Sequence, residues 1–122
     1  MGRVDEDRQR ILHVGTREMV IQLRDKILRL HGLEVFSTLS LEEARARFEQ
    51  EPVDLVLVDV EGQGRVPQAE DFCAAIRELR PKQKVAFVCN YQVSIDSNCP
   101  DEIIEAEFNP EAFVAGVLRM FE

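Results

Sequence analysis

The chain has 122 residues, a formal net charge of −8 and 45% apolar residues, which suits one globular domain. The acidic balance disfavours binding to nucleic acid, which needs clustered Lys and Arg, and binding to an anionic membrane face. We expect residues 1–122 to form a single domain whose core runs from about residue 10 to residue 121.

Cysteine usage and the N-terminus bear on the compartment. The three cysteines, an odd number with wide spacing, fit neither a disulfide framework nor a zinc site; they are Cys73, Cys89 and Cys99. The N-terminal residues MGRVDEDRQR lack the apolar segment of a signal peptide. Both observations favour a cytoplasmic location.

The first third of the chain predicts a strand, a helix and a second strand. Residues 10–14 (RILHV) and 33–37 (LEVFS) read as strands. Between them, apolar residues recur at helical spacings of four, four and three, which predicts a helix over residues 16–30 that ends at Gly32. These apolar residues are Met19, Leu23, Ile27 and Leu30.

The middle of the chain predicts a second helix and a central strand. Ser40 and Glu43 form a capping box at the start of a helix over residues 40–48. We expect its buried stripe to consist of Leu41, Ala44 and Phe48. Residues 53–59 (VDLVLVD) are apolar at successive positions, as in a parallel strand covered on both faces.

The last part of the chain continues the alternation. A third helix ends before Pro81, and strands follow at residues 84–89 and 102–106. Asn109 and Pro110 are typical of an N-cap and first turn, and they predict a final helix. The expected inward residues of these two helices are Phe72, Ile76 and Leu79, then Phe113, Val117 and Met120.

Alternating strands and helices predict an α/β fold with three layers, in which helices cover both faces of a parallel sheet. Five strands in a chain of this length favour the flavodoxin-like order 2-1-3-4-5. In that topology the ligand crevice lies outside the carboxyl ends of the first and third strands. Asp59 ends the third strand and is therefore expected in the crevice.

Several segments together resemble the receiver domain of bacterial two-component response regulators. They are ILHV, GLEVFSTLSLEEARARF, PVDLVLVDV, AAIRELRP and FNPEAFVAGVLRMF, and they cover nearly the whole chain. In that family the aspartate that ends the third strand accepts a phosphoryl group from a histidine kinase. The resemblance makes Asp59 the phosphoacceptor candidate, and a histidine kinase or an output domain the expected partner.

The remaining crevice positions depart from the receiver pattern. The resemblance places two Mg²⁺-binding acids where this chain has Gly15 and Thr16. It places Thr or Ser at the end of the fourth strand, where Cys89 and Asn90 stand here. It places a lysine where this chain has Ala106. Asp59 alone carries over, so the sequence predicts an atypical receiver.

These losses predict impaired Mg²⁺-dependent phosphorylation. Phosphoryl transfer needs charge neutralised on the transferred group, and Mg²⁺ supplies much of that neutralisation. We expect no cofactor, because Asp59 alone is a poor Mg²⁺ site and no lysine offsets the added charge. Glu61 and Glu18 are weak candidates for replacement metal ligands; the alternative is a loop acid and a solvated acid in the first turn of a helix.

Several crevice residues have a structural interpretation beside the functional one. Asp59 is expected either to cap a neighbouring backbone N–H or to retain phosphoacceptance. Cys89 is expected to be a small buried apolar residue rather than a nucleophile. His13, inside the first strand, is expected to be a packed core residue, and Thr16 to cap the first helix.

The resemblance implies a fourth helix after the fourth strand, but residues 91–96 (YQVSID) alternate apolar and polar side chains and Pro100 follows. That period is typical of extended chain. We therefore expect the fourth helix to be shortened or replaced, with an irregular loop as the alternative. The resemblance implies that this region forms the face that reports phosphorylation to partners.

Three functions are open from the sequence. The first is a receiver-like signalling module that is not an enzyme and acts through protein–protein contacts. The second is a phosphorylatable receiver that uses Asp59 with Glu61 or Glu18. The third is a small flavodoxin-like ligand-binding domain or enzyme. We expect no contact with nucleic acid or membrane through this domain, and a homodimer is possible.

Overall fold

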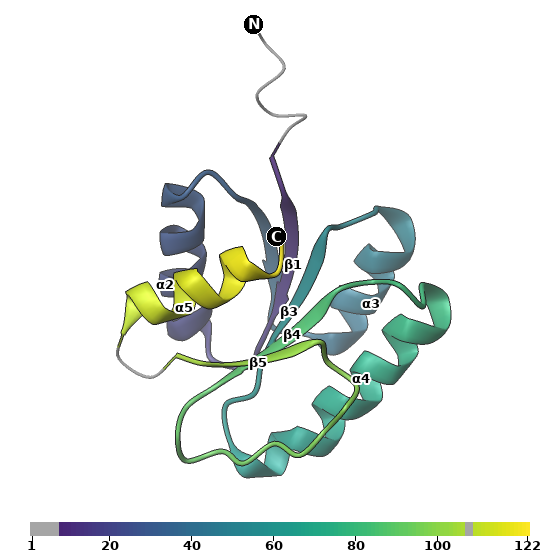
Figure 1. Cartoon of the computed structure of the whole chain (residues 1–122). Coiled ribbons are helices and arrows are strands. Elements are labelled where there is room, and N and C mark those ends of the chain that lie inside the picture. Colours follow the sequence, from purple (N-terminus) through teal and green to yellow (C-terminus); the bar gives the residue numbers. More distant parts are fainter. Residues whose placement is uncertain (1–7, 107–108) are drawn as a thin grey trace, which may run out of the picture.

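The computed structural model describes residues 8–106 and 109–122, and strands and helices alternate along them (Figure 1). Most of the N-terminal stretch that lacks an apolar segment, residues 1–7, lies outside the described residues. Within them, no helix combines the length and apolar character that crossing a bilayer requires. The elements are β1 (Arg10–Val14), α2 (Glu18–Leu30), β2 (Glu34–Thr38), α3 (Leu41–Gln50), β3 (Leu55–Asp59), the 3-10 helix η1 (Gln63–Arg65), α4 (Val66–Leu79), β4 (Val85–Cys89), β5 (Glu102–Glu105) and α5 (Pro110–Arg119).

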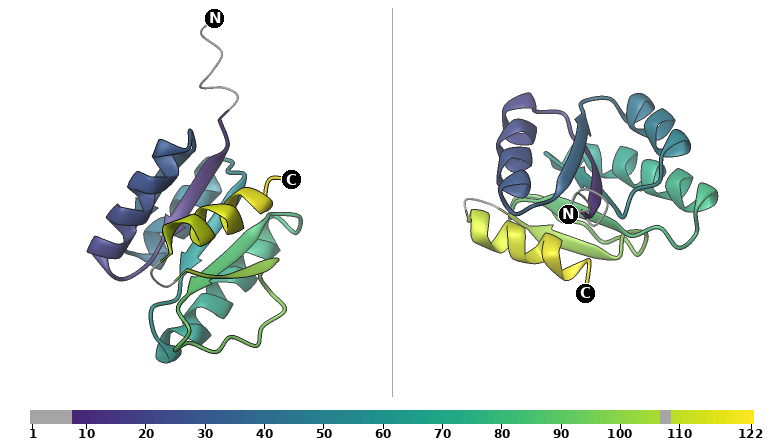
Figure 2. Two further views of the ribbon diagram at one scale, coloured as in Figure 1. Left: turned by 60° about the vertical axis from the view of Figure 1, so that its left-hand side comes forward. Right: turned by 90° about the horizontal axis from the view of Figure 1, so that it is seen from above.

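The five strands form one parallel sheet in the order β2-β1-β3-β4-β5, which confirms the predicted flavodoxin-like topology. Helices α2 and α5 cover one face of the sheet, and α3 and α4 cover the other (Figure 2). The register places His13 of β1 beside Leu57 of β3, and Asp59 beside Val88 of β4. The strand order reverses between β1 and β3, so the carboxyl ends of these two strands open the crevice.

Two apolar cores lie on the two sides of the sheet. Every residue of β3 and β4 is buried, because helices cover both faces of these central strands. Phe48 and Phe87 anchor the core on the α3 and α4 side, whereas Leu28 and Phe113 anchor the core on the α2 and α5 side. This packing fixes the backbone at the carboxyl ends of β1 and β3, where the candidate site lies.

Helix α2 forms as predicted, but the apolar stripe that revealed it faces outward. Met19, Leu23 and Leu30 are 83%, 63% and 76% exposed. The buried face instead consists of Ile21, Asp25 and Leu28. The predicted end of the helix is confirmed: His31 is the C-cap and Gly32 follows with φ of +82°, a conformation that favours glycine.

The helix caps follow the sequence in part. Ser40 is the N-cap of α3 and its Oγ accepts a hydrogen bond of 3.1 Å from the backbone N–H of Glu43. The reciprocal half of the capping box is missing, since the Glu43 carboxylate accepts from the Thr38 hydroxyl instead. Asn109 caps α5 as predicted. Ala44, Phe48, Phe72, Ile76, Phe113, Val117 and Met120 are buried as expected, whereas Leu41 and Leu79 are exposed.

The fourth helix of the receiver pattern is absent. Residues 90–101, all of which the structure describes, join β4 to β5 through turns, bends and irregular chain, which confirms that the fourth helix is shortened or missing. The apolar positions of the alternation point inward at Val93, which is buried, and at Ile95, which is half-buried. Both contact the core beside α4. Tyr91 departs from it, because its side chain is 65% exposed.

The expectation that the cysteines form no disulfide is wrong. Cys73 of α4 and Cys99 of the segment before β5 are joined in a disulfide, with their Cα atoms 6.3 Å apart. Their separation of 26 residues gives no local spacing signal, because the fold brings them together. Cys89 is the free cysteine of the three and is buried, as expected.

Candidate functional site

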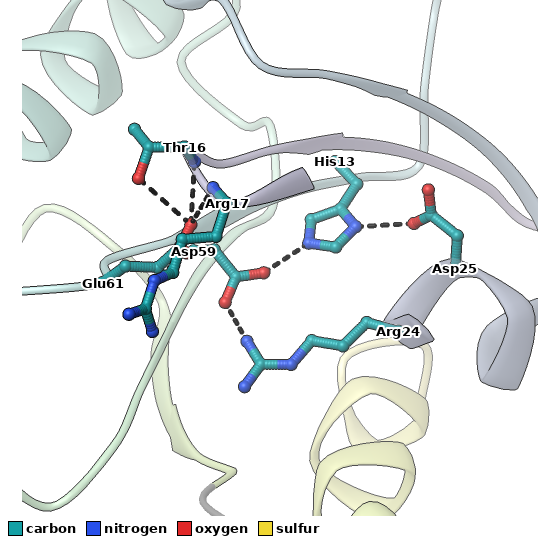
Figure 3. Close-up of polar contacts among 7 residues, drawn as sticks. All are labelled: His13, Thr16, Arg17, Arg24, Asp25, Asp59 and Glu61. Carbon is teal, nitrogen blue, oxygen red and sulfur yellow. Dashed lines mark hydrogen bonds and ion pairs between the residues drawn. The ribbon is translucent and has the colours of Figure 1, made fainter. Parts of the chain in front are cut away.

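The candidate site lies at the carboxyl ends of β1 and β3, where residues from four parts of the chain meet (Figure 3). Strand β1 supplies His13, and the loop after it supplies Gly15 and Thr16. Strand β3 ends at Asp59, and Glu61 follows. Helix α2 contributes Arg24 and Asp25, which the sequence analysis did not include in the site.

Asp59 is buried and held by two basic side chains. Its side chain is 1% exposed, and its Oδ2 lies 2.5 Å from His13 Nε2. Its Oδ1 forms an ion pair with the guanidinium of Arg24 (Figure 3). Of the two interpretations of Asp59, the structure does not show the capping of a backbone N–H, because its oxygens contact side chains of β1 and α2 instead. No lysine lies at Asp59, as expected, but Arg24 supplies a counter-charge that the sequence analysis did not foresee.

His13 is the expected core residue, with no exposed surface, but it also bridges two acids. Its Nδ1 lies 2.6 Å from Asp25 Oδ1, opposite the contact from Nε2 to Asp59. An ionised carboxylate accepts hydrogen bonds and does not donate them, so both ring nitrogens donate when both acids are ionised. We call Arg24, Asp59, His13 and Asp25 the buried charge chain; each of its two acids contacts a basic side chain, as buried acids require.

Arg24 reaches the site from α2 across the start of α5. Its side chain is 16% exposed, and its guanidinium carbon lies 5.3 Å from the centroid of the Phe113 ring. Burial lowers the pKa of Arg24 below its usual value, and the negative charge of Glu61 acts in the opposite direction. Asp59 and Phe113 therefore fix the guanidinium between the sheet and α5.

Glu61 turns back over the crevice and binds the backbone of the β1–α2 loop. Its Oε1 accepts hydrogen bonds from the backbone N–H groups of Thr16 and Arg17 at 2.7 and 3.1 Å, and from the Thr16 hydroxyl at 3.3 Å. These N–H groups belong to the loop before α2 and to its N-cap residue, Arg17. Thr16 thus does not cap the helix as expected, and Glu61 instead ties the loop after β3 to the loop before α2.

The other crevice positions do not join the charge chain. Glu18 is exposed and accepts from Gln22 of the next turn at 3.1 Å, which agrees with the solvated first-turn acid. Asn90 Oδ1 accepts from the backbone of Gln92 at 2.8 Å, and Ala106 is buried. Burial, followed by the nearby charge of Glu105, raises the pKa of the Cys89 thiol, which disfavours a nucleophilic thiolate.

Comparison with known proteins adds a fold relationship. No protein-family model and no curated protein sequence matches the chain. Among solved structures, the chemotaxis response regulator CheY4 of Vibrio cholerae superposes with a TM-score of 0.78 at 18% identity, covering 93% of this chain and 98% of that chain. The response regulator TrrA of Thermotoga maritima, solved with Mg²⁺ and BeF, gives 0.78 at 24% identity, covering 92% and 98%. The same regulator in complex with the histidine kinase ThkA gives 0.78 at 23% identity, covering 93% and 99%.

The chain has the fold of response regulator receiver domains. The resemblance noted in the sequence is thereby confirmed at the level of the fold, over most of the chain. Within this receiver fold Asp59 does stand at the end of β3, as the motif indicated.

The residues around Asp59 do not fit a Mg²⁺ ion. Mg²⁺ needs near-octahedral oxygen ligands, usually one or two carboxylates with retained waters. Both oxygens of Asp59 are engaged by His13 and Arg24, and Oε1 of Glu61 holds backbone N–H groups. The described residues include no group of three or more His, Cys, Asp or Glu side chains placed to hold a metal. In this receiver fold the Arg24 guanidinium supplies positive charge at Asp59 instead.

A small pocket lies beside the charge chain, on the α3 and α4 side of the sheet. Its volume is about 200 Å³. Ligand pockets usually measure roughly 300–1,000 Å³. The lining is mostly apolar: Val14, Gly15, Thr16, Leu39, Leu41, Val58, Asp59, Arg65, Gln68 and Ala69. Its size does not favour the ligand-binding alternative.

Arg24 and Asp25 were missed because their roles depend on the tertiary fold. Asp25 gave one signal, since it falls between Ile21 and Leu28 on the buried face of α2. An acid at a buried helical position requires a partner, and the one buried histidine of β1 supplies it. Arg24 gave no such signal, because its neighbours in the sequence do not indicate which way its side chain points.

We predict that Arg24→Met lowers the free energy of unfolding by about 3 kcal/mol, because it leaves the Asp59 carboxylate buried with one partner fewer. Lys26→Met is the matched control on the exposed side of the same helix and should change stability by less than about 0.5 kcal/mol. The Arg24→Met/Asp59→Asn double variant should lose less than the sum of the two single losses. Urea denaturation measures all four; strictly additive losses would contradict a coupled pair.

We also predict that Gly15→Ala destabilises the protein by about 1–3 kcal/mol through overpacking. A Cβ at Gly15 would lie 2.6 Å from Ile21 Cδ1, 2.8 Å from Glu61 Oε1 and 2.9 Å from Asp59 Cβ. Gly64→Ala is the control, since nothing lies within 4 Å of its added Cβ. Thermal melts of the two variants compare them; equal melting temperatures would show that Glu61 does not need the space at Gly15.

Proposed function

We propose that this chain is a receiver-like signalling module of a two-component phosphorelay system that acts through protein–protein contacts. In this proposal Mg²⁺-dependent phosphorylation of Asp59 is impaired. The observation that carries it is the state of the Asp59 side chain, which is 1% exposed and has both oxygens engaged by His13 and Arg24.

The chemistry of phosphoryl transfer explains why this state matters. The attacking carboxylate oxygen must be open to an in-line phosphoryl group, with positive charge placed on the transferred oxygens. Asp59 meets neither condition as it stands. An attacking Oδ1 must first separate from Arg24, and an attacking Oδ2 must first separate from His13. Either separation leaves charged groups of the buried chain without partners.

The alternative, a phosphorylatable receiver with substitute metal ligands, receives less support. Glu18 is exposed and bonds within α2. Glu61 does lie near Asp59, but its carboxylate already serves the backbone of Thr16 and Arg17. To act as ligands, both acids would have to leave the places they occupy.

Protein contacts are supported by the surface of α2 and by a structural neighbour. Met19, Leu23 and Leu30 form an exposed apolar stripe, and such patches mark interaction sites when they are contiguous. The neighbour TrrA was solved in complex with the histidine kinase ThkA. We propose a histidine kinase or an output domain as the partner of this chain.

Other parts of the proposal are expectations from the sequence, although the cysteines no longer favour the cytoplasm, because Cys73 and Cys99 form a disulfide. The module is not an enzyme, carries no resident cofactor, binds neither nucleic acid nor membrane through this domain, and resides in the cytoplasm. Residues 1–122 form its single domain, and a homodimer is possible.

The direct test is exposure to phosphodonors. We predict that acetyl phosphate with Mg²⁺ adds no phosphoryl group to the chain, and that beryllofluoride with Mg²⁺ leaves its amide spectrum unchanged, because Asp59 has no free oxygen. Intact mass measures the addition of a phosphoryl group, and amide NMR spectra measure the response to beryllofluoride. TrrA, solved with Mg²⁺ and BeF, is the positive control for the beryllofluoride measurement.

The variant Asp59→Asn identifies the site of any reaction. A mass increase that this variant abolishes would contradict impaired phosphorylation and favour the phosphorylatable alternative. In that event Glu61→Gln and Glu18→Gln, compared with each other, would show which acid replaces the lost metal ligands.

A further inference from the structure

Residues 90–101, which we call the strap, take the place of the fourth helix and lie along α4. Val93 is buried, and Ile95 and Cys99 are half-buried, against the core that α4 also lines with Phe72 and Ile76. Figure 1 shows the strap as the coil that leaves β4, runs beside α4 and returns to β5. The strap therefore covers part of the core beside α4.

Two sets of hydrogen bonds fasten the strap. Near its middle, the Gln63 side chain pairs with the backbone of Ser94 through two hydrogen bonds of 2.8 and 2.7 Å. Near its end, the Arg77 guanidinium donates to the Cys99 carbonyl oxygen from Nε and Nη2 at 2.8 and 2.6 Å, and reaches Asp101 at 3.0 Å. Both fastenings start from residues at or near α4.

The third fastening is the disulfide from Cys73 to Cys99. Cys73 lies on the buried face of α4 and has no exposed surface, whereas Cys99 belongs to the strap and is half-buried. The Cα separation of 6.3 Å falls within the usual range for a disulfide. This bond joins the strap covalently to a helix that the core holds in place, and it is the one fastening that thiol chemistry can open and close.

We propose that Cys73 and Cys99 form a thiol-redox modification site that controls the mobility of the strap. Its role as the signal input, in place of phosphorylation at Asp59, rests on the proposed function. The co-reactants are a dithiol, which opens the bond, and a small disulfide such as oxidised glutathione, which closes it by two exchanges and is itself reduced to two thiols.

The chemistry is a two-electron exchange through a mixed disulfide. A thiolate of the dithiol attacks Sγ of Cys99, the less buried sulfur, and forms a bond to it. The bond between the two cysteines breaks, and Cys73 leaves as a thiolate that takes up a proton. The second thiol of the reductant then attacks the mixed disulfide, which releases Cys99 as a thiol and leaves the reductant as a cyclic disulfide.

The surroundings of the pair suit reversible opening. A reduced Cys73 is a small apolar side chain in an apolar core, which tolerates it. The Arg77 and Gln63 hydrogen bonds do not require the disulfide, so opening loosens the strap without unfolding the domain. The buried Cys89 has a raised pKa and stays a thiol, which disfavours its exchange with the pair.

Hydrogen exchange with mass spectrometry tests the proposal on the whole chain. We predict that dithiothreitol raises amide exchange over residues 94–101 by about tenfold or more, while β1, β3 and α2 are unchanged. In this range the backbone N–H groups of Ser94, Cys99 and Asp101 donate hydrogen bonds. Cys89→Ala should keep this difference between oxidised and reduced protein. Cys73→Ala/Cys99→Ala should abolish it and match the reduced protein in both conditions.

Arg77 provides a second, independent readout, because it fastens the same end of the strap. In Arg77→Lys, which keeps the charge but loses the fork of donors, reduction should raise exchange over residues 94–101 by a larger factor than in the unsubstituted chain. An unchanged factor would contradict the inference that Arg77 and the disulfide hold the same segment of the strap.

Two results would overturn the proposal. One is the absence of a peptide linking Cys73 to Cys99 after treatment with oxidised glutathione. The other is a linked peptide together with equal exchange over residues 94–101 before and after reduction. Neither result depends on Asp59; phosphorylation of Asp59 would instead overturn the proposed function and leave the exchange measurements intact.

Discussion

The site depends on the neutralisation of one buried carboxylate. Asp59 ends a strand that helices cover on both faces, so water cannot stabilise its charge. Arg24 and His13 do so instead, and Asp25 balances His13 from the other side. This buried charge chain ties α2 to β1 and β3, and it engages both oxygens of Asp59. The receiver fold is kept, and the loss of phosphoryl chemistry that we propose for the end of β3 follows from these contacts.

The fold could be predicted from the sequence because short segments show the periodicity of their strands and helices. Apolar runs such as residues 10–14 and 84–89 predict strands, and the structure has strands there. Asn109 predicts the start of the last helix, which begins at Pro110 in the structure. The absent fourth helix was also readable, since YQVSID alternates and Pro100 follows. The orientation of α2 was not readable, because its exposed stripe of Met19, Leu23 and Leu30 has the same helical spacing as a buried one.

The sequence predicted only the part of the site that lies at the end of a strand. Topology alone placed Asp59 in the crevice, but its partner Arg24, and Asp25, which contacts His13, lie on a helix 34 or more residues earlier. Their approach depends on how α2 rotates against the sheet, and periodicity does not specify that rotation. The disulfide was missed for the same reason, because the packing of the strap on α4 brings Cys73 and Cys99 together. Short-range motifs therefore identified the framework, and long-range packing decided the chemistry.

The most direct measurement of the central claim is the protonation of the charge chain by ¹⁵N-edited NMR at neutral pH. The account predicts two ring N–H signals from His13, one for each carboxylate it faces, and slowly exchanging guanidinium protons from Arg24. A His13 ring with one unprotonated nitrogen, together with rapidly exchanging Arg24 protons, would show that Asp59 is not held between two cations and would contradict the account.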